Sequence, residues 1–577
     1  MSLNGRLTSL RPRLVVHHAT SLSLRPQRRC LNEFISHAVA PSSEGIPPPP
    51  PPNSFRLAVK DNIATYSSKD DGNNNNNGLP TTCASGILSS HDSPLEATIV
   101  KQLVARGAHV VGKTNLDEFG MGTHSVNTPH GAVAQLINDN NNNDHTKIHL
   151  SAGGSSGGSA VAVQSGAAEV ALGTDTGGSV RLPAAYCGVV GFKPSYGMIS
   201  RYGVVPYANS LDTVGLLARD VRAVREVVLG GDRPLHLEHD PRDPTSLSPA
   251  ARARCTAARG CYFDLGSRSS PSGGGGGGDV QEKTKEVLRP LTFGIPVEYN
   301  ISELDGCVRE AWEDAARVLR DEVGARVVPV SLPSTRHALS AYYVIAPAEA
   351  SSNLAKYDGV RYGIRQPDIE GKNNNTNNNN SSDGGGGVLY SGVRGEGFGP
   401  EVKRRILLGS YTLSSEAMDN YFIQAQRVRQ LVRQDFDRVF RLSNPLRDED
   451  DQHFPLSEMD EAVVLENKLG PAQVDFLLCP TAPTLPPRLE DVDGSEGGQE
   501  GERKKESPVD AYMNDVFTVP ASLAGLPAVS IPKGVRLPPE EAWRGQGQAR
   551  MGLQIIGQYW DDARLLAAAE ALSALLR

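Results

Sequence analysis

The sequence predicts an α/β protein: one large domain built on a mixed or mostly parallel sheet, with helices on both faces. Two observations support this fold class. Apolar segments of strand length alternate with amphipathic segments of helical length through much of the chain. In addition, residues 151–194 hold two Gly/Ser-rich clusters around an apolar run. Glycine allows close backbone approach, so we expect two loops to meet there beside buried structure.

Length and composition narrow the classes of protein that are possible. A chain of 577 residues can bury a large core, and its hydrophobic fraction of 38% is lowered by Asn- and Gly-rich runs. The net charge of −8 leaves no overall basic field for independent nucleic-acid binding. The 7 cysteines are scattered and form no CxxC pair, which argues against a disulfide framework and a structural zinc site. No apolar run is long enough to predict a membrane-spanning helix.

The N-terminal segment has the composition of a targeting sequence. Residues 1–32 contain 6 arginines and many serines and leucines, but no Asp or Glu. This composition is typical of a mitochondrial transit peptide, although a basic tail or a wrongly assigned start codon would look similar. Residues 33–577 are predicted to form the single domain. Low-complexity inserts, expected in solvated or disordered loops, interrupt it near residues 67–78, 138–147, 232–286, 371–388 and 487–508.

The first half of the domain predicts short strands and helices around the Gly/Ser clusters. The apolar start of FRLAVKDNIAT predicts a strand that ends at Lys60. The elements expected after it are a helix over 95–107, a strand, turn and short helix over 109–123, a helix over 159–168 and a strand over 169–173.

The second half repeats the alternation of strands and helices. Strands are predicted over 291–298, 325–332, 474–480 and 553–560, and helices over 308–323, 339–357, 400–413, 416–440 and 561–576. No internal repeat is evident. This alternation is what predicts a largely buried sheet.

The second Gly/Ser cluster is the first candidate for chemistry. Ser179 follows Thr176, Gly177 and Gly178 in a turn between a strand and a helix. Such a serine can expose its hydroxyl beside several main-chain N–H groups, which describes a nucleophile next to an oxyanion hole. Similar turns also bind phosphate, or contain a serine with no role. The chain has no GxxxxGK[ST] string, so a P-loop is not expected.

A nucleophilic serine needs a base, and the histidines of this chain fall in no recognisable motif. A lysine can act as the base if burial keeps it neutral. Lys60 is a candidate because it ends a strand and is followed by Asp61 and Asn62. On position alone, a surface lysine at a strand end is the favoured interpretation.

Three ordered motifs resemble the amidase signature family. They are GGSSGGSA, DTGGSVRLPAAYCGVVGFKPSYG and, upstream, VKDNI. The resemblance implies a Ser–cis-Ser–Lys triad with Ser179 as nucleophile, Ser155 as bridging serine and Lys60 as base. It also implies an oxyanion hole formed by main-chain N–H groups of Thr176, Gly177, Gly178 and Ser179.

Further segments resemble the glutamine-hydrolysing subunits of tRNA-dependent amidotransferases. They include GKTNLDEFGMG, EASSNLAKYDGVRYG, EVKRRILLGSYTLSS and MNDVFTVPASLAGLPAVSIP. The resemblance implies that the substrate is glutamine, whose ammonium and carboxylate groups need charged partners. Asp515 would bind the ammonium group, and Arg405 or Arg404 the carboxylate, with a hydrogen bond from Tyr343 or Tyr342.

The same resemblance implies an assembly. Ammonia would pass to a B-type partner subunit that uses ATP and Mg²⁺ to amidate Glu-tRNA(Gln), and a small third subunit would complete the complex. This chain itself would bind no cofactor and no metal, would contact tRNA mainly through its partner, and would work in the mitochondrial matrix. The helical portion that the family has before the lysine segment is expected to be absent or truncated here.

Two alternatives to this assembly remain at this stage. One is a stand-alone amidase that acts on small or fatty amides, and the other is a non-enzymatic scaffold that kept the fold. The complete set of Lys60, Ser155 and Ser179 argues against the scaffold. The charged residues implied for glutamine argue against an apolar amide as substrate.

Overall fold

The structure is a computed structural model. It describes residues 31–38, 54–66, 79–136, 149–230, 234–267, 277–364, 390–447, 473–492, 508–538 and 549–576. Residues 31–577 cluster as one unit. The predicted transit peptide, apart from its last two residues, lies outside the described residues. So do the predicted inserts at 67–78, 138–147 and 371–388, and residues 493–507 of the last insert.

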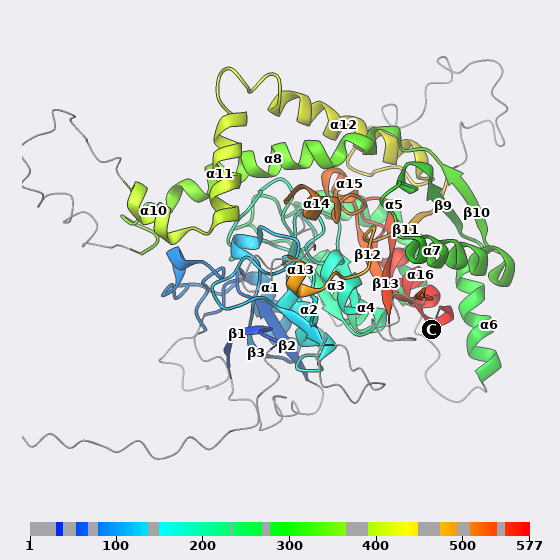
Figure 1. Ribbon diagram of the computed structural model, residues 1–577. Helices are drawn as coiled ribbons and strands as arrows, with labels where there is room; N and C mark the ends of the chain where they lie inside the picture. The colour runs from blue at the N-terminus through cyan, green and yellow to red at the C-terminus, as the bar shows by residue number, and fades with distance from the viewer. Residues whose placement is uncertain are drawn as a thin grey trace, which may run out of the picture. The chain divides into compact units, whose positions relative to one another are not determined.

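One sheet of 11 strands runs through the described residues, in the order β1-β3-β2-β6-β8-β7-β12-β13-β11-β9-β10 (Figure 1). Its strands are β1 (Phe34–His37), β2 (Phe55–Lys60), β3 (Ala108–Thr114), β6 (Val170–Asp175), β7 (Val190–Lys193), β8 (Thr213–Ala218), β9 (Thr292–Pro296), β10 (Arg326–Val330), β11 (Phe476–Pro480), β12 (Ala528–Gly534) and β13 (Arg550–Gly557). A second pair is formed by β4 (Ala134–Leu136) and β5 (His149–Ser151).

The large sheet is mixed. Strands β3, β2 and β6 are parallel, as are β11, β9 and β10. Between these two groups, every neighbouring pair from β6 to β11 is antiparallel. Strands β2, β6, β8 and β11 are buried at nearly every position, so they are rich in Val, Leu and Ala. A strand buried on both faces shows this continuous apolar pattern.

Helices cover both faces of this sheet. A Cβ added to Gly552 of β13 would lie 2.3 Å from the Cβ of Ala185 in α3 (Arg181–Cys187). A Cβ added to Gly557 of the same strand would instead lie 3.6 Å from the Cβ of Leu565 in α16 (Asp562–Leu575). Side chains alternate between faces along a strand, so positions five apart point to opposite sides. Helices α3 and α16 therefore sandwich the centre of the sheet.

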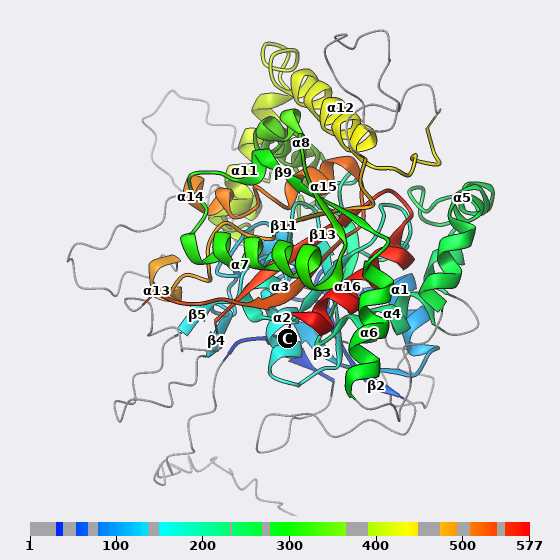
Figure 2. The same cartoon turned by 90° about the vertical axis from the view of Figure 1, so that its right-hand side faces the viewer.

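A further layer of helices carries residues of the predicted substrate site. It consists of α8 (Ala338–Asn353), α11 (Pro400–Thr412) and α12 (Phe422–Val439), with α15 (Val519–Ala524) in contact with α8 and α12. Figures 1 and 2 both show α8, α11 and α12 grouped on one side of the strands. The other helices are α1 (Thr98–Val104), α2 (Gly157–Gln164), α4 (Val221–Leu229), α7 (Gly306–Arg317), α10 (Ser391–Gly397), α13 (Leu489–Val492) and α14 (Pro508–Met513).

The prediction of a disordered insert over 232–286 does not agree with the structure. Helices α5 (Pro249–Ser267) and α6 (Gly277–Leu288) occupy much of it, and both contact α16. The alanine-rich start of α5 favours a helix. Arg252 then fixes this helix by donating to the main-chain oxygens of Gly197, Met198 and His236. The glycine run between the two helices hid these local signals in the average composition.

Two further elements were not predicted from the sequence. Strand β1 pairs antiparallel with β3 and forms one edge of the sheet. Helix α7 continues as a π-helical segment over Val318–Val323. Helix α4 and the strands β4, β5, β7, β8 and β12 were not assigned individually either. The other strands and the long helices were predicted, with end points that differ by a few residues.

Candidate active site

Lys60 lies at the end of β2 and is fully buried, at 0% exposure. This burial excludes the surface lysine that position alone allowed. Its Nζ is 2.8 Å from Ser155 Oγ, 2.8 Å from Ser156 Oγ and 3.0 Å from Thr174 Oγ1. Thr174 comes from β6, which pairs with β2. The first Gly/Ser cluster and two neighbouring strands thus meet around one amine.

The pKa of Lys60 is lowered to about 7. Burial is the largest cause, because removal from water disfavours the charged amine. The carboxylates of Asp117 and Asp175 oppose the shift by raising the pKa. A substantial fraction of neutral Lys60 is therefore present near neutral pH, and only the neutral amine can accept a proton.

The peptide bond between Gly154 and Ser155 is cis. Asp117 packs directly against it, since a Cβ added to Gly154 would lie 2.3 Å from Asp117 Oδ2. The Asp117 carboxylate accepts from the main-chain N–H groups of Ser125 (2.9 Å) and Asn127 (3.0 Å). Only glycine leaves room for this carboxylate, which explains the residue before the bridging serine.

Ser179 lies in the loop between β6 and α3, within the second Gly/Ser cluster. The two clusters are joined at this point, because the N–H of Ser156 donates to the Ser179 carbonyl at 3.1 Å. Ser179 is half-buried, and no described residue forms a hydrogen bond with its hydroxyl. The structure thus pairs Lys60 with Ser155, but does not join Ser155 to Ser179 by a hydrogen bond. Contacts of this kind often tighten only when substrate binds.

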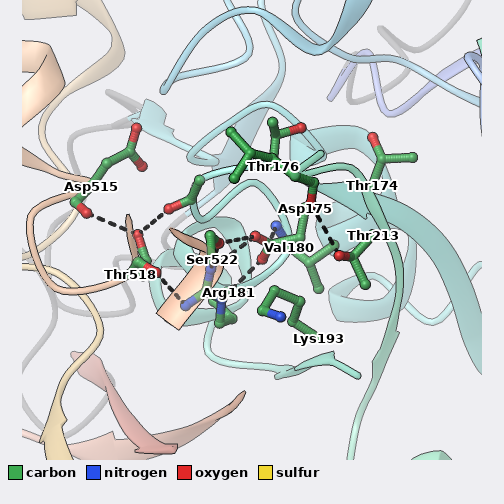
Figure 3. A network of polar contacts seen from close by, with 12 residues as sticks. Thr174, Asp175, Thr176, Val180, Arg181, Lys193, Thr213, Asp515, Thr518 and Ser522 are labelled. Atoms are coloured by element: carbon green, nitrogen blue, oxygen red, sulfur yellow. Dashed lines mark hydrogen bonds and ion pairs between the residues drawn. The ribbon is translucent and has the colours of Figure 1, made fainter. Parts of the chain in front are cut away.

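A buried ion pair between Asp175 and Arg181 joins the two ends of the Ser179 loop (Figure 3). Arg181 Nη2 and Nε lie 2.8 and 2.9 Å from the two carboxylate oxygens of Asp175. Nη1 of the same arginine donates to the Thr518 carbonyl and to Gln554, both at 2.8 Å. Bidentate geometry with further hydrogen bonds is the arrangement in which a buried ion pair is best satisfied. The loop between Asp175 and Arg181 is therefore held at both ends.

The main chain of this loop has N–H groups available for a ligand. No described residue accepts a hydrogen bond from the N–H of Thr176, Gly177, Gly178 or Ser179. The ring of Tyr342 covers Gly177, where an added Cβ would lie 2.6 Å from its Cζ. Unpaired N–H groups beside a half-buried serine are what an oxyanion hole requires.

Asp515 lies on the other side of the same loop and is buried. A Cβ added to Gly178 would lie 3.0 Å from Asp515 Oδ1. Tyr343 donates from its hydroxyl to Asp515 Oδ2 at 3.1 Å. Burial raises the pKa of Asp515 to about 7, against the lowering effects of Tyr343 and Arg405. This carboxyl lacks a directly bonded cation among the described residues, so a positively charged ligand would stabilise its ionised form.

Arg405 of α11 is held behind this carboxyl. Its Nε is 2.8 Å from Glu401 Oε1, and its Nη1 is 2.7 Å from the hydroxyl of Tyr207. The guanidinium also lies against the rings of Tyr343 and Tyr512, which stack on each other with centroids 4.0 Å apart. These aromatic faces are a favourable surface for a guanidinium. They also fix its position relative to Asp515.

The sequence left open which arginine of α11 and which of two adjacent tyrosines belongs to the site. The structure distinguishes the two members of each pair. The side chain of Arg405 is 4% exposed, whereas that of Arg404 is 50% exposed and contacts only Glu401 among the described residues. Tyr343 hydrogen-bonds to Asp515, whereas Tyr342 packs against Gly177. Arg405 is thus the buried member of its pair, and Tyr343 is the tyrosine that contacts Asp515, while Tyr342 lies against the Ser179 loop.

Comparisons with known proteins show the family of this chain. A family model described as Amidase matches residues 57–566. The chain belongs to the amidase family. The matched region contains Lys60, both Gly/Ser clusters and Asp515.

Curated relatives cover the whole chain. A protein of Neurospora crassa, named as the A-type subunit of mitochondrial glutamyl-tRNA(Gln) amidotransferase, is 56% identical over 100% of this chain and 99% of its own length. The protein of the same name from Podospora anserina is 58% identical over 96% of this chain and 97% of its own length.

Solved structures share the fold. The crystal structure of the A-type glutamyl-tRNA(Gln) amidotransferase subunit from Thermotoga maritima has a TM-score of 0.57 and 29% identity, and covers 93% of this chain and 86% of that one. Allophanate hydrolase of Kluyveromyces lactis matches with a TM-score of 0.57, 22% identity, and coverage of 91% of this chain and 62% of that one. The second likeness concerns the fold alone.

Several residues of this amidase-family site were not predicted. Ser156 and Thr174 contact Lys60 directly, and Glu401, Tyr207 and Tyr512 contact Arg405 or its partners. Ser156 could have been found, since it shares the GGSSGGS motif with Ser155. Thr174 precedes the DTGGS motif and Glu401 opens the EVKRR segment, but only the fold shows which side chains these and the two tyrosines contact.

Two findings bear on cofactors and membranes. Among the described residues, no group of three or more His, Cys, Asp and Glu side chains is arranged to hold a metal ion. Within the same ranges, every helix is too short or too polar to cross a lipid bilayer.

Proposed function

We propose that this chain hydrolyses glutamine as the A-type subunit of a mitochondrial glutamyl-tRNA(Gln) amidotransferase, and so supplies ammonia for converting Glu-tRNA(Gln) to Gln-tRNA(Gln). The observation that carries the proposal is that two ionisable side chains, Asp515 and Arg405, are buried near each other, with Asp515 against Gly178 of the Ser179 loop and Arg405 against the ring of Tyr343. An amide substrate with both an ammonium and a carboxylate group needs such a pair. The relatives named above support it, because they match the chain along its full length.

Glutamine would be held by its backbone groups. The α-ammonium would lie against Asp515, whose buried carboxyl gains a cation by this contact. The α-carboxylate would lie against Arg405, with the Tyr343 hydroxyl next to both groups. Asp515 approaches Gly178, so a substrate anchored there would extend its side-chain amide along the loop toward Ser179.

The reaction would proceed through an acyl-enzyme. Neutral Lys60 takes the Ser155 proton, Ser155 takes the Ser179 proton, and Ser179 Oγ attacks the side-chain amide carbon. Main-chain N–H groups of residues 176–179 stabilise the oxyanion. The relay returns the proton to the leaving nitrogen, the C–N bond breaks, and ammonia departs. Water then attacks the ester, which releases glutamate and restores Ser179.

The hydroxyls around Lys60 are consistent with this direction of proton transfer. A neutral amine has two N–H donors and one lone pair, so one of its neighbouring hydroxyls must donate to it. The Ser156 hydroxyl can direct its own proton to the Thr174 carbonyl at 3.4 Å. The Thr174 hydroxyl, which accepts from Asn62, is a second possible donor to Lys60 Nζ. The Ser155 hydroxyl has no other partner among the described residues, so it can donate to Lys60 Nζ as a relay needs.

The wider assembly follows from the same proposal. Ammonia would pass to a B-type subunit that uses ATP and Mg²⁺ to activate and amidate glutamate on tRNA(Gln), with a small third subunit completing the complex. Residues 1–32 would direct the chain to the mitochondrial matrix. The net charge of −8 fits a chain whose partner subunit makes most of the contacts with tRNA.

The decisive experiment is purification of the tagged full chain from mitochondria. We expect an ATP-dependent partner subunit to co-purify, and the complex to hydrolyse glutamine. In the complex with Ser179→Ala, glutamine should no longer support amidation of Glu-tRNA(Gln), whereas added ammonium should still do so. Glutamine-dependent amidation at the normal rate in this variant would show that Ser179 is not the nucleophile.

A stand-alone amidase for small or fatty amides is the second candidate, and the charged pair disfavours it. A long-chain fatty amide has no ammonium or carboxylate to match Asp515 and Arg405. Arg405 is already paired with Glu401, but the burial of the Asp515 carboxyl would then cost free energy with no cation to offset it. Comparing kcat/KM for glutamine and for a fatty primary amide decides between the two, because a preference for the fatty amide would contradict the proposal.

A further inference from the structure

Thr518 places its hydroxyl against the Ser179 loop rather than against its own helix. It stands at the N-cap of α15, yet its side chain makes no capping hydrogen bond there. Instead its Oγ1 donates to the Gly177 carbonyl at 2.6 Å (Figure 3). The Asp515 carbonyl, at 3.1 Å, is a more distant second acceptor. Threonine is a common N-cap residue because its hydroxyl can satisfy the first N–H groups of a helix. The Thr518 hydroxyl does not cap α15 in this way.

The position of this hydroxyl determines the direction of one N–H group. In a planar trans peptide, the C=O and the following N–H point to opposite sides. Because the Gly177 carbonyl is held by Thr518, the N–H of Gly178 points away from Thr518. No described residue accepts a hydrogen bond from it. A rotation of this peptide would replace a free donor in the loop by a carbonyl oxygen, which would repel an oxyanion.

The contact between Thr518 and the Ser179 loop is close and shielded from solvent. Thr518 is fully buried, and a Cβ added to Gly178 would lie 2.3 Å from its Oγ1. The main chain of Thr518 is itself fixed, because its carbonyl accepts from Arg181 Nη1 at 2.8 Å. Arg181 in turn pairs with Asp175 at the start of the loop. The hydroxyl is thus supported from the same network that holds the ends of the loop.

The same turn also carries Asp515. The N–H groups of Thr518 and Val519 donate to the Asp515 carbonyl at 3.1 and 3.0 Å. Asp515 Oδ1 lies 3.0 Å from the position of a Cβ on Gly178. One short turn therefore presents the carboxyl proposed to hold the substrate ammonium and the hydroxyl that holds the Gly177 carbonyl.

We propose that Thr518 is a positioning residue that orients the Gly177–Gly178 peptide so that the Gly178 N–H stabilises the oxyanion formed when Ser179 attacks. The inference rests on the proposed acylation of Ser179. It goes beyond it, because it assigns the orientation of the oxyanion hole to one side chain that is far from the loop in the sequence. Thr518 touches neither the substrate nor the reacting atoms. It acts through the peptide that it holds.

The test compares Thr518→Val with Thr518→Ser in the purified complex. Valine keeps the shape of threonine and loses the hydroxyl, whereas serine keeps the hydroxyl. Removing one oxyanion donor typically lowers kcat by about 10²–10³-fold. We expect Thr518→Val to lower kcat for glutamine by roughly 10²-fold with little change in KM, and Thr518→Ser to retain most of the activity.

A second readout separates positioning from a general structural role. The aldehyde analogue of glutamine, glutamate γ-semialdehyde, would form a tetrahedral adduct with Ser179 and would need the oxyanion hole. Glutamine binding to Ser179→Ala forms no adduct and needs only the charged pair. We expect Thr518→Val to weaken aldehyde inhibition about as much as it lowers kcat/KM. Glutamine affinity should be equal in Ser179→Ala with and without Thr518→Val.

The outcomes distinguish this inference from the proposed function. A wild-type complex that does not hydrolyse glutamine contradicts the proposed function. An active wild type in which Thr518→Val keeps a normal kcat, or loses glutamine affinity and aldehyde inhibition to the same degree, contradicts the inference alone. Should Thr518→Val fail to fold, Thr518→Ala with the same two readouts replaces it. Ammonium-dependent amidation reports whether the complex is intact.

Discussion

Lys60 can act as a base because its surroundings remove it from water while giving it only hydroxyl and carbonyl partners. Burial lowers its pKa to about 7, and burial also raises the pKa of Asp515 to about 7. Both groups must be deprotonated for the proposed reaction, Lys60 to accept a proton and Asp515 to bind an ammonium group. Lys60 and Asp515 each lose a proton as pH rises, so activity should rise with pH as either group titrates.

This shared direction gives a specific pH dependence for kcat/KM, which reports groups of the free enzyme. We expect log kcat/KM for glutamine to rise with a slope approaching two below pH 7 and to level off above it. In Asp515→Asn, the much lower kcat/KM should rise with a slope of one, because only Lys60 still titrates. A slope of two that persists in Asp515→Asn would assign the second proton to another group.

The two neighbouring arginines of α11 offer a matched comparison. Lysine in place of Arg405 keeps the charge but loses the planar fork that reaches two partners at once. Hydrogen bonds to charged groups contribute about 1.5–3 kcal/mol, so Arg405→Lys should raise KM for glutamine by roughly 10–100-fold. Arg404→Lys, at a half-exposed position, should leave KM unchanged. Steady-state kinetics of both variants decide the point, and equal effects would place the carboxylate elsewhere.

Residue chemistry was the part of the site that the sequence predicted best. Lys60, Ser155 and Ser179 stand in motifs whose order and spacing are visible in the chain. The choice between Arg404 and Arg405 was not visible, because it depends on which side of α11 faces α8 and the tyrosines around Arg405. A helix turns by 100° per residue, so adjacent positions differ completely in exposure.

At the scale of elements, the helix pair α8 and α11 positions two residues proposed to bind the substrate, since α8 carries Tyr343 and α11 carries Arg405. Gly409 of α11 lies against α8, where an added Cβ would be 2.0 Å from the Pro347 carbonyl oxygen. Gly409→Ala should therefore push the helices apart. Overpacking of this kind costs about 1–3 kcal/mol, and we expect a lower free energy of unfolding together with a raised KM for glutamine.

Gly306→Ala is the control for this prediction. Gly306 is the first residue of α7, and a Cβ there would meet nothing within 4 Å. Its replacement should leave the unfolding free energy unchanged or slightly higher, since alanine favours a helix. Chemical denaturation of both variants measures the difference. A Gly409→Ala protein as stable as the control would mean that α8 and α11 can separate without cost.

Most of the long helices with an apolar stripe were predicted, although α4, which buries Val221, Val224 and Val228, was not. Some of the other omissions have a physical origin. Helix α5 is fixed by Arg252, whose acceptors Gly197, Met198 and His236 lie upstream in the sequence. Such long-range contacts add stability that no local window of sequence contains. Strand β1 was missed for the same reason, because three half-buried residues and one exposed residue become a strand only beside β3.

At the scale of the whole molecule, the sheet order explains why the site could not be assembled from sequence alone. Strands β2 and β6 are neighbours, which places Lys60 beside Thr174. The turn that carries Asp515 reaches the same loop from near the other end of the chain. Motifs can identify each part, but only the topology of the mixed sheet shows that they meet.

The edge of this sheet leads to a prediction about the N-terminal segment. Residues 31–38 are fastened to the domain by several contacts. Asn32 donates to the Ala132 carbonyl at 3.0 Å, the N–H of Asn115 donates to the Glu33 carbonyl at 3.0 Å, and Phe34 packs against Gly112. Strand β1 also covers the edge of β3, which would otherwise present unpaired main-chain groups to solvent.

Two truncated chains should therefore differ in stability, according to whether they keep β1. A chain that begins at Leu31 keeps every contact of β1, and should keep the thermal stability and glutaminase activity of the matured protein. A chain that begins at Ala40 loses β1 and exposes the edge of β3, so we expect a lower melting temperature and aggregation through that edge. Thermal unfolding and light scattering of the two chains, each assembled with its partners, test this. If both chains were equally stable, β1 would be dispensable and the structural boundary of the domain would lie after residue 38.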